Sequence, residues 1–179
     1  MGWRVHYYSY QNRNDLRLGA GFQGAAMDSQ LLNDARGLQA RTVAMRREIH
    51  RHPELGLDLP RTRETVLDAL YGLDLEVSCS EATSGVVATL RGVHPGPTVL
   101  LRGDMDALPM PEDTDLPFAS EESGRMHACG HDAHTAMLAS AAHLLSTRAD
   151  ALAGNVRFMF CLLYTSDAAD ARSSVDLGG

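Results

Sequence analysis

The sequence contains no lysine, and all 16 basic residues among its 179 residues are arginine. Enzymes that form a Schiff base with a lysine amine are therefore excluded, and so are nucleotide-binding loops of the Walker type. Positive charge is also in the minority, because 23 acidic residues give the chain a formal net charge of −7. This balance argues against a nucleic-acid partner.

Cysteines, aromatic residues and long apolar runs are scarce as well. Three cysteines are too few for a disulfide framework, and the odd count favours reduced thiols and a cytoplasmic location. No run approaches the roughly 18 apolar residues of a membrane-spanning helix, so we expect no membrane partner. Residues 1–24 also lack the apolar core of a secretory signal. The apolar content of 44% is sufficient for a globular core.

The chain divides into three parts by composition. Residues 1–26 follow neither a helical nor a strand period, and we expect them to be disordered or to precede a true start at Met27; an aromatic hairpin is the alternative. Residues 27–160 carry the periodic patterns of a folded domain. Residues 161–179 break off abruptly from the preceding strand pattern and look like translated sequencing-adaptor read-through. We expect them to be a non-biological tail, with a divergent natural C-terminus as the alternative.

Hydrophobic periodicity predicts an α/β fold with a mixed sheet flanked by helices. The expected helices span 28–52, 61–73 and 132–147, and the expected strands span 75–79, 85–91, 97–102 and 155–160. Residues 94–97 read His-Pro-Gly-Pro and predict a turn between two strands. A long loop is expected over 104–128.

The segment 127–134 concentrates groups that can bind a metal. It holds three imidazoles, one thiol and one carboxylate in eight residues: His127, Cys129, His131, Asp132 and His134. Thiolate and imidazole are ligands that borderline-soft divalent ions prefer. An extended backbone here would place residues 127, 129 and 131 on one side. The alternative is an ordinary helix start with Asp132 as its cap.

Two aspartates, Asp104 and Asp106, follow an apolar strand directly. Functional groups in open α/β sheets gather at the carboxyl ends of strands, so either carboxylate could contact a metal or orient one of its ligands. The alternative is a solvated acidic turn. The acidic residues that follow in this loop, Glu112 among them, are expected to be mostly solvated surface.

A further histidine pair, His50 and His52, precedes Pro53 and Glu54. Both imidazoles could be ligands. We expect instead that this segment ends a helix, that Pro53 and Gly56 shape the following turn, and that Glu54 hydrogen-bonds locally.

Three motifs together resemble the aminoacylase, hippurate hydrolase and auxin-conjugate hydrolase branch of zinc-type metallopeptidase family twenty. They are residues 47–56 (REIHRHPELG), 102–109 (RGDMDALP) and 126–135 (MHACGHDAHT), in the family's order and spacing. The likeness covers roughly residues 30–160. It implies the N-terminal part of the catalytic domain of a metallo-exopeptidase, truncated before the domain that mediates dimers and closes over substrate.

The resemblance also implies an activity and a set of site residues. Such enzymes hydrolyse the amide bond of N-acyl amino acids or related conjugates with two divalent metal ions, manganese or zinc. By position, Cys129 and His131 match metal ligands and Asp106 matches the catalytic aspartate that orients the centre. Asp104, His127 and His134 are candidates for supporting the ligands or contacting substrate. The intact protein is expected to be a homo-oligomer that binds a small-molecule substrate.

The match stops after residue 160. Family members continue this strand into a Gln-Pro-x-Glu-Glu element that supplies the general base and a metal ligand, whereas residues 161–170 here read CLLYTSDAAD. We therefore expect the chain as written to be inactive. Two other functions stay open: a non-catalytic metal-binding module, and a cysteine hydrolase with Cys129 as nucleophile.

Overall fold

The computed structural model describes residues 24–162, which form three α-helices, one short 3-10 helix and four strands. The helices are α1 (Gly24–Arg51), α2 (Pro60–Leu70), α3 (His131–Ser146) and the 3-10 helix Ala149–Ala151. The strands are β1 (Glu76–Cys79), β2 (Val86–Arg91), β3 (His94–Asp104) and β4 (Ala153–Cys161). Every predicted helix and strand is present, with ends displaced by a few residues. Our expectations for residues 1–23 and 163–179 lie outside the described part.

The four strands form one mixed sheet in the order β1-β2-β4-β3. β4 is antiparallel to β2 and parallel to β3, so the last strand in sequence occupies a central position. The parallel pair is joined through α3, which is the crossover that two parallel strands need. The predicted α/β fold with a mixed sheet is therefore confirmed.

The turn predicted at 94–97 is wrong, because β3 already begins at His94. The prolines are tolerated there because β3 is an edge strand, and its pairing with β4 shifts register between His94 and Thr98. The backbones approach closely at this point. Gly154 has φ 87°, and a Cβ on it would lie 1.9 Å from the carbonyl oxygen of Pro97.

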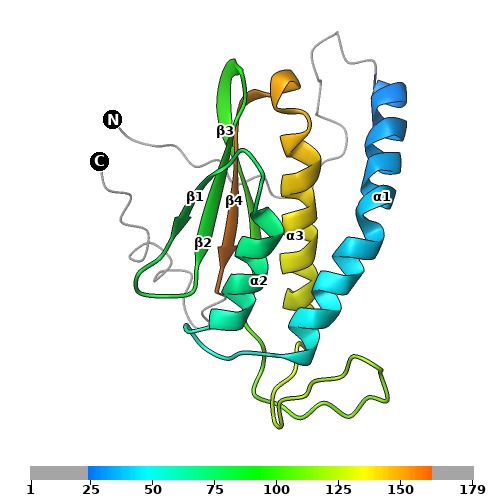
Figure 1. The fold of residues 1–179 in the computed structure, drawn as a ribbon, viewed down its shortest axis with the longest axis vertical. Coiled ribbons are helices and arrows are strands. Elements are labelled where there is room, and N and C mark those ends of the chain that lie inside the picture. The colour runs from blue at the N-terminus through cyan, green and yellow to red at the C-terminus, as the bar shows by residue number, and fades with distance from the viewer. Residues whose placement is uncertain (1–23, 163–179) are drawn as a thin grey trace, which may run out of the picture.

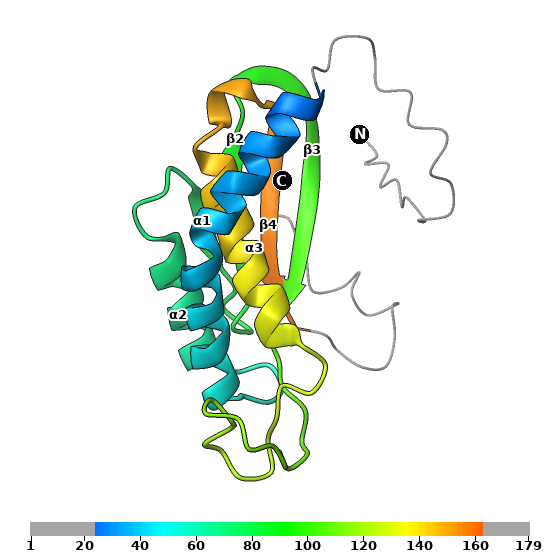
Figure 2. The ribbon, with the colours of Figure 1, turned by 90° about the vertical axis from the view of Figure 1, so that its right-hand side faces the viewer.

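The three helices lie on one side of the sheet, with α3 between α1 and the strands (Figures 1 and 2). α3 is apolar, and seven of its 16 residues are buried, which agrees with the burial that its composition predicts. Its Ser140 hydroxyl lies 2.6 Å from the hydroxyl of Thr42 on α1. The core between the helices and the sheet is built from apolar side chains that include Leu59, Val66, Leu70, Val86, Leu90, Phe158 and Phe160.

The other face of the sheet carries no helix in residues 24–162 (Figure 2). Apolar side chains on the outer strands stay about half exposed, among them Val77 on β1 and Val99 on β3. None of the helices described here combines the length and the apolar character that a membrane crossing requires.

The segment between α1 and α2 is structural, as expected for Glu54. Its carboxylate accepts hydrogen bonds from the backbone N–H groups of Arg61 and Thr62 and from the Thr62 hydroxyl. These contacts satisfy amide groups that the first turn of α2 leaves without intrahelical partners. The end of α1 is thereby held beside the start of α2.

The long predicted loop is present and runs over residues 105–130 at one end of the molecule, next to the end of α1 and the start of α3 (Figure 1). Its two arms are joined near the base, where Leu108 and Met126 exchange two backbone hydrogen bonds. The backbone N–H of Glu121 also donates to the carbonyl of Arg51 at the end of α1.

Candidate metal centre

The candidate centre lies where β3 ends against the first turn of α3. Asp104 is the last residue of β3, and its carbonyl oxygen accepts a hydrogen bond of 2.8 Å from the Thr135 hydroxyl on α3. The strand reaches this position because Gly103 lacks a side chain: a Cβ there would lie 3.0 Å from the carbonyl oxygen of His134. The sequence thus brings a carboxylate at the end of a strand next to the histidines of a helix start.

The Asp104 carboxylate is surrounded by cationic and hydrogen-bonding groups. Its Oδ1 lies 2.6 Å from Nδ1 of His134, and its Oδ2 lies 3.8 Å from Nε2 of His131 and 3.3 Å from Arg102. Burial alone would raise the pKa of Asp104. The hydrogen bonds and the charges of His131 and Arg102 outweigh burial and hold that pKa below its ordinary value. The carboxylate is therefore kept ionised, as a metal ligand must be.

The His131 ring is oriented by the other aspartate of the pair. Its Nδ1 lies 2.7 Å from the backbone carbonyl oxygen of Asp106 and 3.3 Å from Oδ1 of the same residue. Because both of these are acceptors, Nδ1 carries the proton and donates. Nε2 is the ring nitrogen that faces Asp104, across 3.8 Å. Hydrogen bonds of this kind commonly orient histidines that bind metals.

Asp104, His131 and His134 form a group, called here the metal group, in which one ligand atom of each lies within 4.8 Å of the others. Carboxylate and imidazole suit zinc and manganese. Two ligands bound at about 2.0–2.2 Å on a tetrahedral ion lie roughly 3.3–3.6 Å apart. The contacts of 2.6 Å and 3.8 Å around Asp104 fall on either side of that spacing. The residues present therefore fit a divalent ion with small side-chain movements.

Cys129 lies outside the metal group. Residues 128–129 form a turn, Gly130 has φ 77°, and the Cys129 side chain is exposed. The backbone here is not extended, so the alternation that would align residues 127, 129 and 131 does not hold. Gly130 precedes the first residue of α3 and permits this sharp entry into the helix.

His127 is placed differently from both predicted ligands. It is 4% exposed, and neither of its ring nitrogens has a hydrogen-bond partner in residues 24–162. Burial lowers the pKa of His127 to about 4. The nearby imidazoles of His50 and His131 also lower this pKa, and the carboxylates of Asp132 and Asp106 raise it. Its imidazole is neutral at pH 7.

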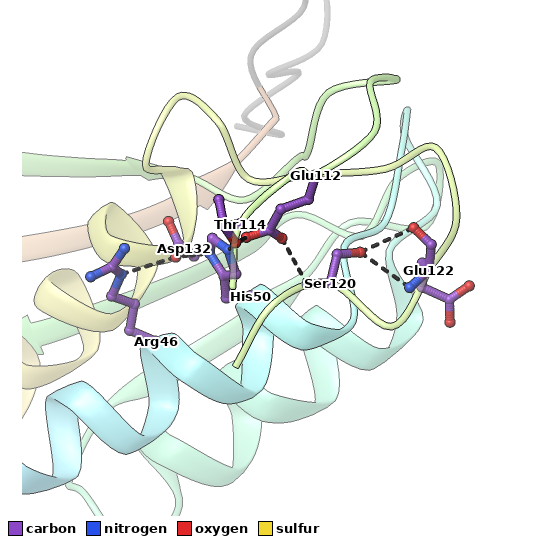
Figure 3. A network of polar contacts seen from close by, with 7 residues as sticks. All are labelled: Arg46, His50, Glu112, Thr114, Ser120, Glu122 and Asp132. Carbon is purple, nitrogen blue, oxygen red and sulfur yellow. Dashed lines mark hydrogen bonds and ion pairs between the residues drawn. The ribbon is translucent and has the colours of Figure 1, made fainter. Parts of the chain in front are cut away.

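The start of α3 is held by a polar network that sequence reasoning missed (Figure 3). Asp132 does not cap the helix, because it lies within the first turn and Gly130 occupies the cap position without a side-chain bond. Its Oδ2 instead lies 2.8 Å from Nδ1 of His50 and 3.0 Å from Nε of Arg46. Both partners come from the last turns of α1, so the predicted structural role of His50 extends beyond the end of its helix.

The acidic loop residues Asp113, Asp115, Glu121 and Glu122 are exposed as expected, and Glu112 is the exception. Its side chain is 3% exposed, and Oε1 lies 3.2 Å from Nε2 of His50. The carboxylate also accepts bonds from the Thr114 hydroxyl and the Ser120 backbone N–H. Burial would raise the pKa of Glu112, and these donors lower it below its ordinary value. No local pattern separates Glu112 from its exposed acidic neighbours, since its partner lies 62 residues away.

The fold and the centre together define an α/β protein with a carboxylate–histidine metal group at the carboxyl edge of its sheet. Residues 100–161 match the model of peptidase family M20/M25/M40. The thermostable carboxypeptidase 1 of Saccharolobus solfataricus is 44% identical over 132 residues, which are 73% of this chain and 34% of that protein. The N-acyl-L-amino acid amidohydrolase of Geobacillus stearothermophilus is 45% identical over 119 residues, 66% of this chain and 32% of that protein.

A solved structure shares the fold. The dinuclear metal-binding M20 peptidase of Bacillus subtilis superposes with a TM-score of 0.66 at 41% identity, over 70% of this chain and 35% of that one. The chain thus spans about a third of the length of these relatives. It belongs to the M20 peptidase family and resembles the aminoacylases and N-acyl amino acid amidohydrolases within it.

Proposed function

We propose that this chain is the N-terminal part of the catalytic domain of a metal-dependent amidohydrolase that cleaves N-acyl amino acids or related conjugates. The observation that carries the proposal is the convergence of Asp104, His131 and His134 at the carboxyl end of β3. A parallel strand end is where α/β enzymes present catalytic groups. The names of two relatives, an N-acyl-L-amino acid amidohydrolase and a carboxypeptidase, support the substrate class.

The intact centre would hold two divalent ions, zinc or manganese. His131 offers Nε2 as a ligand atom because Asp106 holds the proton on Nδ1. Asp106 therefore acts as the orienting aspartate of the centre. Cys129 is the second proposed ligand from this segment, and its exposed thiol at the helix entry is open to an ion shared with residues beyond this chain.

The remaining residues have supporting roles. Asp104 and His134 supply a carboxylate and an imidazole to the metal group, which is a closer role than the sequence suggested for them. His127 is buried and neutral, which suits a residue that supports the metal ligands without binding the metal itself. Bound metal ions lower the pKa of water from about 15.7 towards 7 and polarise the amide carbonyl.

Turnover needs a glutamate that moves the proton from water to the leaving amine. Family resemblance places that glutamate just after the strand matching β4, where this sequence reads Cys161 and Leu162. We therefore propose that the 179-residue chain binds metal without hydrolysing substrate, and that a protein with the family's full catalytic domain is the active form. Dimerisation would belong to the domain that the family inserts beyond this region.

The test uses two proteins: the 179-residue chain, and a chimera in which residues 30–160 replace the matching part of the Geobacillus amidohydrolase. We expect the chimera to release amino acid from N-acyl substrates, to lose activity with a chelator and to regain it with added Mn²⁺. The 179-residue chain should bind Mn²⁺ without turnover. A chimera whose activity survives chelation but not thiol alkylation would contradict the proposal and support the cysteine-hydrolase alternative.

A further inference from the structure

The imidazole of His50 is clamped between two carboxylates that come from different segments (Figure 3). Nδ1 lies 2.8 Å from Oδ2 of Asp132, and Nε2 lies 3.2 Å from Oε1 of Glu112. Asp132 belongs to the first turn of α3, and Glu112 belongs to the loop over 105–130. His50 itself is in the last turn of α1. The ring thus connects the end of α1 with two distant parts of the chain. Glu112 lies 62 residues after His50, and Asp132 lies 82 residues after it.

All three side chains are removed from solvent. The exposed fractions are 4% for His50, 3% for Glu112 and 0% for Asp132. Each ring nitrogen of His50 lies within hydrogen-bond distance of one carboxylate oxygen. Arg46 makes a further ion pair with Asp132. The two buried carboxylates therefore have polar partners, which buried charged groups require.

The position of Asp132 makes this cluster relevant to the metal group. It lies next to His131 and two residues before His134, within the same helical turn. The contacts of the metal group and the Thr135 hydroxyl also join this turn to its surroundings. The position in which Asp132 is held therefore contributes to the direction of the two imidazoles.

Glu112 makes the same ring relevant to the loop. Its carboxylate closes the loop on itself by accepting the Ser120 backbone N–H at 2.7 Å. Phe118, from the closed segment, packs edge-on against His50 with ring centroids 5.5 Å apart. The loop over 105–130 contains Asp106, whose carbonyl orients His131.

We propose that His50 is a positioning residue for the metal centre: through Asp132 it fixes the first turn of α3, and through Glu112 it fixes the loop that carries Asp106. In residues 24–162, no hydrogen bond or ion pair joins His50 directly to the metal group, and its polar partners are Asp132 and Glu112. Each nitrogen contacts a different part of the fold: Nδ1 contacts Asp132 on α3, and Nε2 contacts Glu112 in the loop. This inference rests on the proposed function only where it concerns metal affinity.

The first experiment tests the contacts of His50 with Asp132 and with Glu112 separately and without metal. It measures amide hydrogen exchange on the full 179-residue chain in chelator. His50→Asn keeps a donor near the position of Nδ1, and His50→Gln keeps one near the position of Nε2. We expect His50→Asn to preserve protection of the Ala133 and His134 amides, both bonded to the Gly130 carbonyl, and to speed exchange of the Ser120 amide. His50→Gln should do the reverse, and His50→Ala should speed both by about tenfold or more.

The second experiment titrates the same proteins with Mn²⁺ alone, well below the unfolding temperature of each variant. We expect His50→Ala to weaken Mn²⁺ binding about tenfold or more, since partners outside the coordination sphere typically contribute 10–100-fold. His50→Asn should recover most of that loss. His52→Ala is the matched control, because His52 lies two residues away and pairs with Glu48 instead.

The outcomes separate this inference from the proposed function. If the parent chain binds no Mn²⁺ while the exchange pattern is as expected, the proposed function fails and the positioning role of His50 stands. If folded His50→Ala, Asn and Gln variants all show parent-like exchange, or all lose protection equally across the whole domain, the positioning role is overturned. Where the parent chain does bind Mn²⁺, an unchanged Mn²⁺ affinity in folded His50→Ala would equally overturn it.

Discussion

The Nδ1 of His131 donates a hydrogen bond of 2.7 Å to the backbone carbonyl of Asp106, which leaves Nε2 directed at Asp104. A backbone carbonyl cannot lose its acceptor character by protonation, so this contact fixes the tautomer of the ring. The motif Asp-Met-Asp thus contributes in two ways. Its first aspartate offers a carboxylate to the metal group, and its second orients a neighbouring imidazole through the main chain.

Replacement of His131 by alanine should weaken Mn²⁺ or Zn²⁺ binding by about 100-fold or more, because one of the few protein ligands is lost. Isothermal titration of the 179-residue chain measures the change. His94→Ala is the control, since His94 is an exposed imidazole on β3 away from the centre. Equal affinities for the parent and the His131 variant would show that His131 is not a ligand.

Cys129 and Cys79 offer a test of whether the thiol binds metal. Both thiols are exposed, and Cys79 lies at the end of β1. We expect the Co²⁺-loaded chain to show a sulfur-to-cobalt charge-transfer band that Cys129→Ser removes and Cys79→Ser leaves intact. A band that survives Cys129→Ser would exclude this thiol from the centre.

His127 should make the fold less stable as the pH falls. Its pKa is about 4 in the folded chain against 6.5 for the ordinary side chain, so between these values the unfolded state binds more protons. Stability therefore decreases as the pH falls from about 6.5 to about 4, by up to roughly 3 kcal/mol. His127→Gln should remove this component. Urea unfolding in chelator at about pH 7.5 and about pH 4 compares the two proteins.

The quantity to compare is the change in the free energy of unfolding between the two pH values, for the parent and for His127→Gln. The variant should lose less free energy of unfolding than the parent as the pH is lowered. Parallel losses in both proteins would mean that His127 is not held neutral by burial.

Gly154 and Gly37 should respond in opposite directions to replacement by alanine. Gly154 has φ 87°, and an added Cβ would lie only 1.9 Å from the Pro97 carbonyl oxygen, so Gly154→Ala should destabilise by about 2–4 kcal/mol. Gly37 is exposed within α1 and has open space around it, so Gly37→Ala should stabilise by about 0.5–1 kcal/mol. Denaturant unfolding measures both. A neutral Gly154→Ala would mean that β3 and β4 separate easily at this point.

Local patterns were sufficient to predict the helices and strands. Each α-helix has an apolar face or an apolar body, and β2, the middle of β3 and β4 each contain a run rich in apolar residues. The turn expected at 94–97 failed because a proline signal cannot distinguish a turn from an edge strand. That distinction depends on the strand order, in which β3 lies at the edge.

The candidate site was predictable in composition but not in detail. Motif spacing placed His131, Asp104 and Asp106 near one another because a strand end and a helix start meet at one edge of the sheet. It gave no means of seeing that His134 lies closer to Asp104 than His131 does. The contact between Glu112 and His50 was equally hidden, since it depends on how a loop of irregular backbone folds back onto α1.

The central place of β4 has a consequence for how the chain acquires its structure. β4 is synthesised after all the other strands, yet it is the only one of the four that joins β2 to β3. While the ribosome has not yet delivered Ala153–Cys161, the β1–β2 hairpin and the strand bearing Asp104 have no common partner. Assembly of these four strands into one sheet, and with it the placement of Asp104 beside α3, must therefore await the synthesis of β4, so pairing of β2 with β3 through β4 is a non-local event in folding.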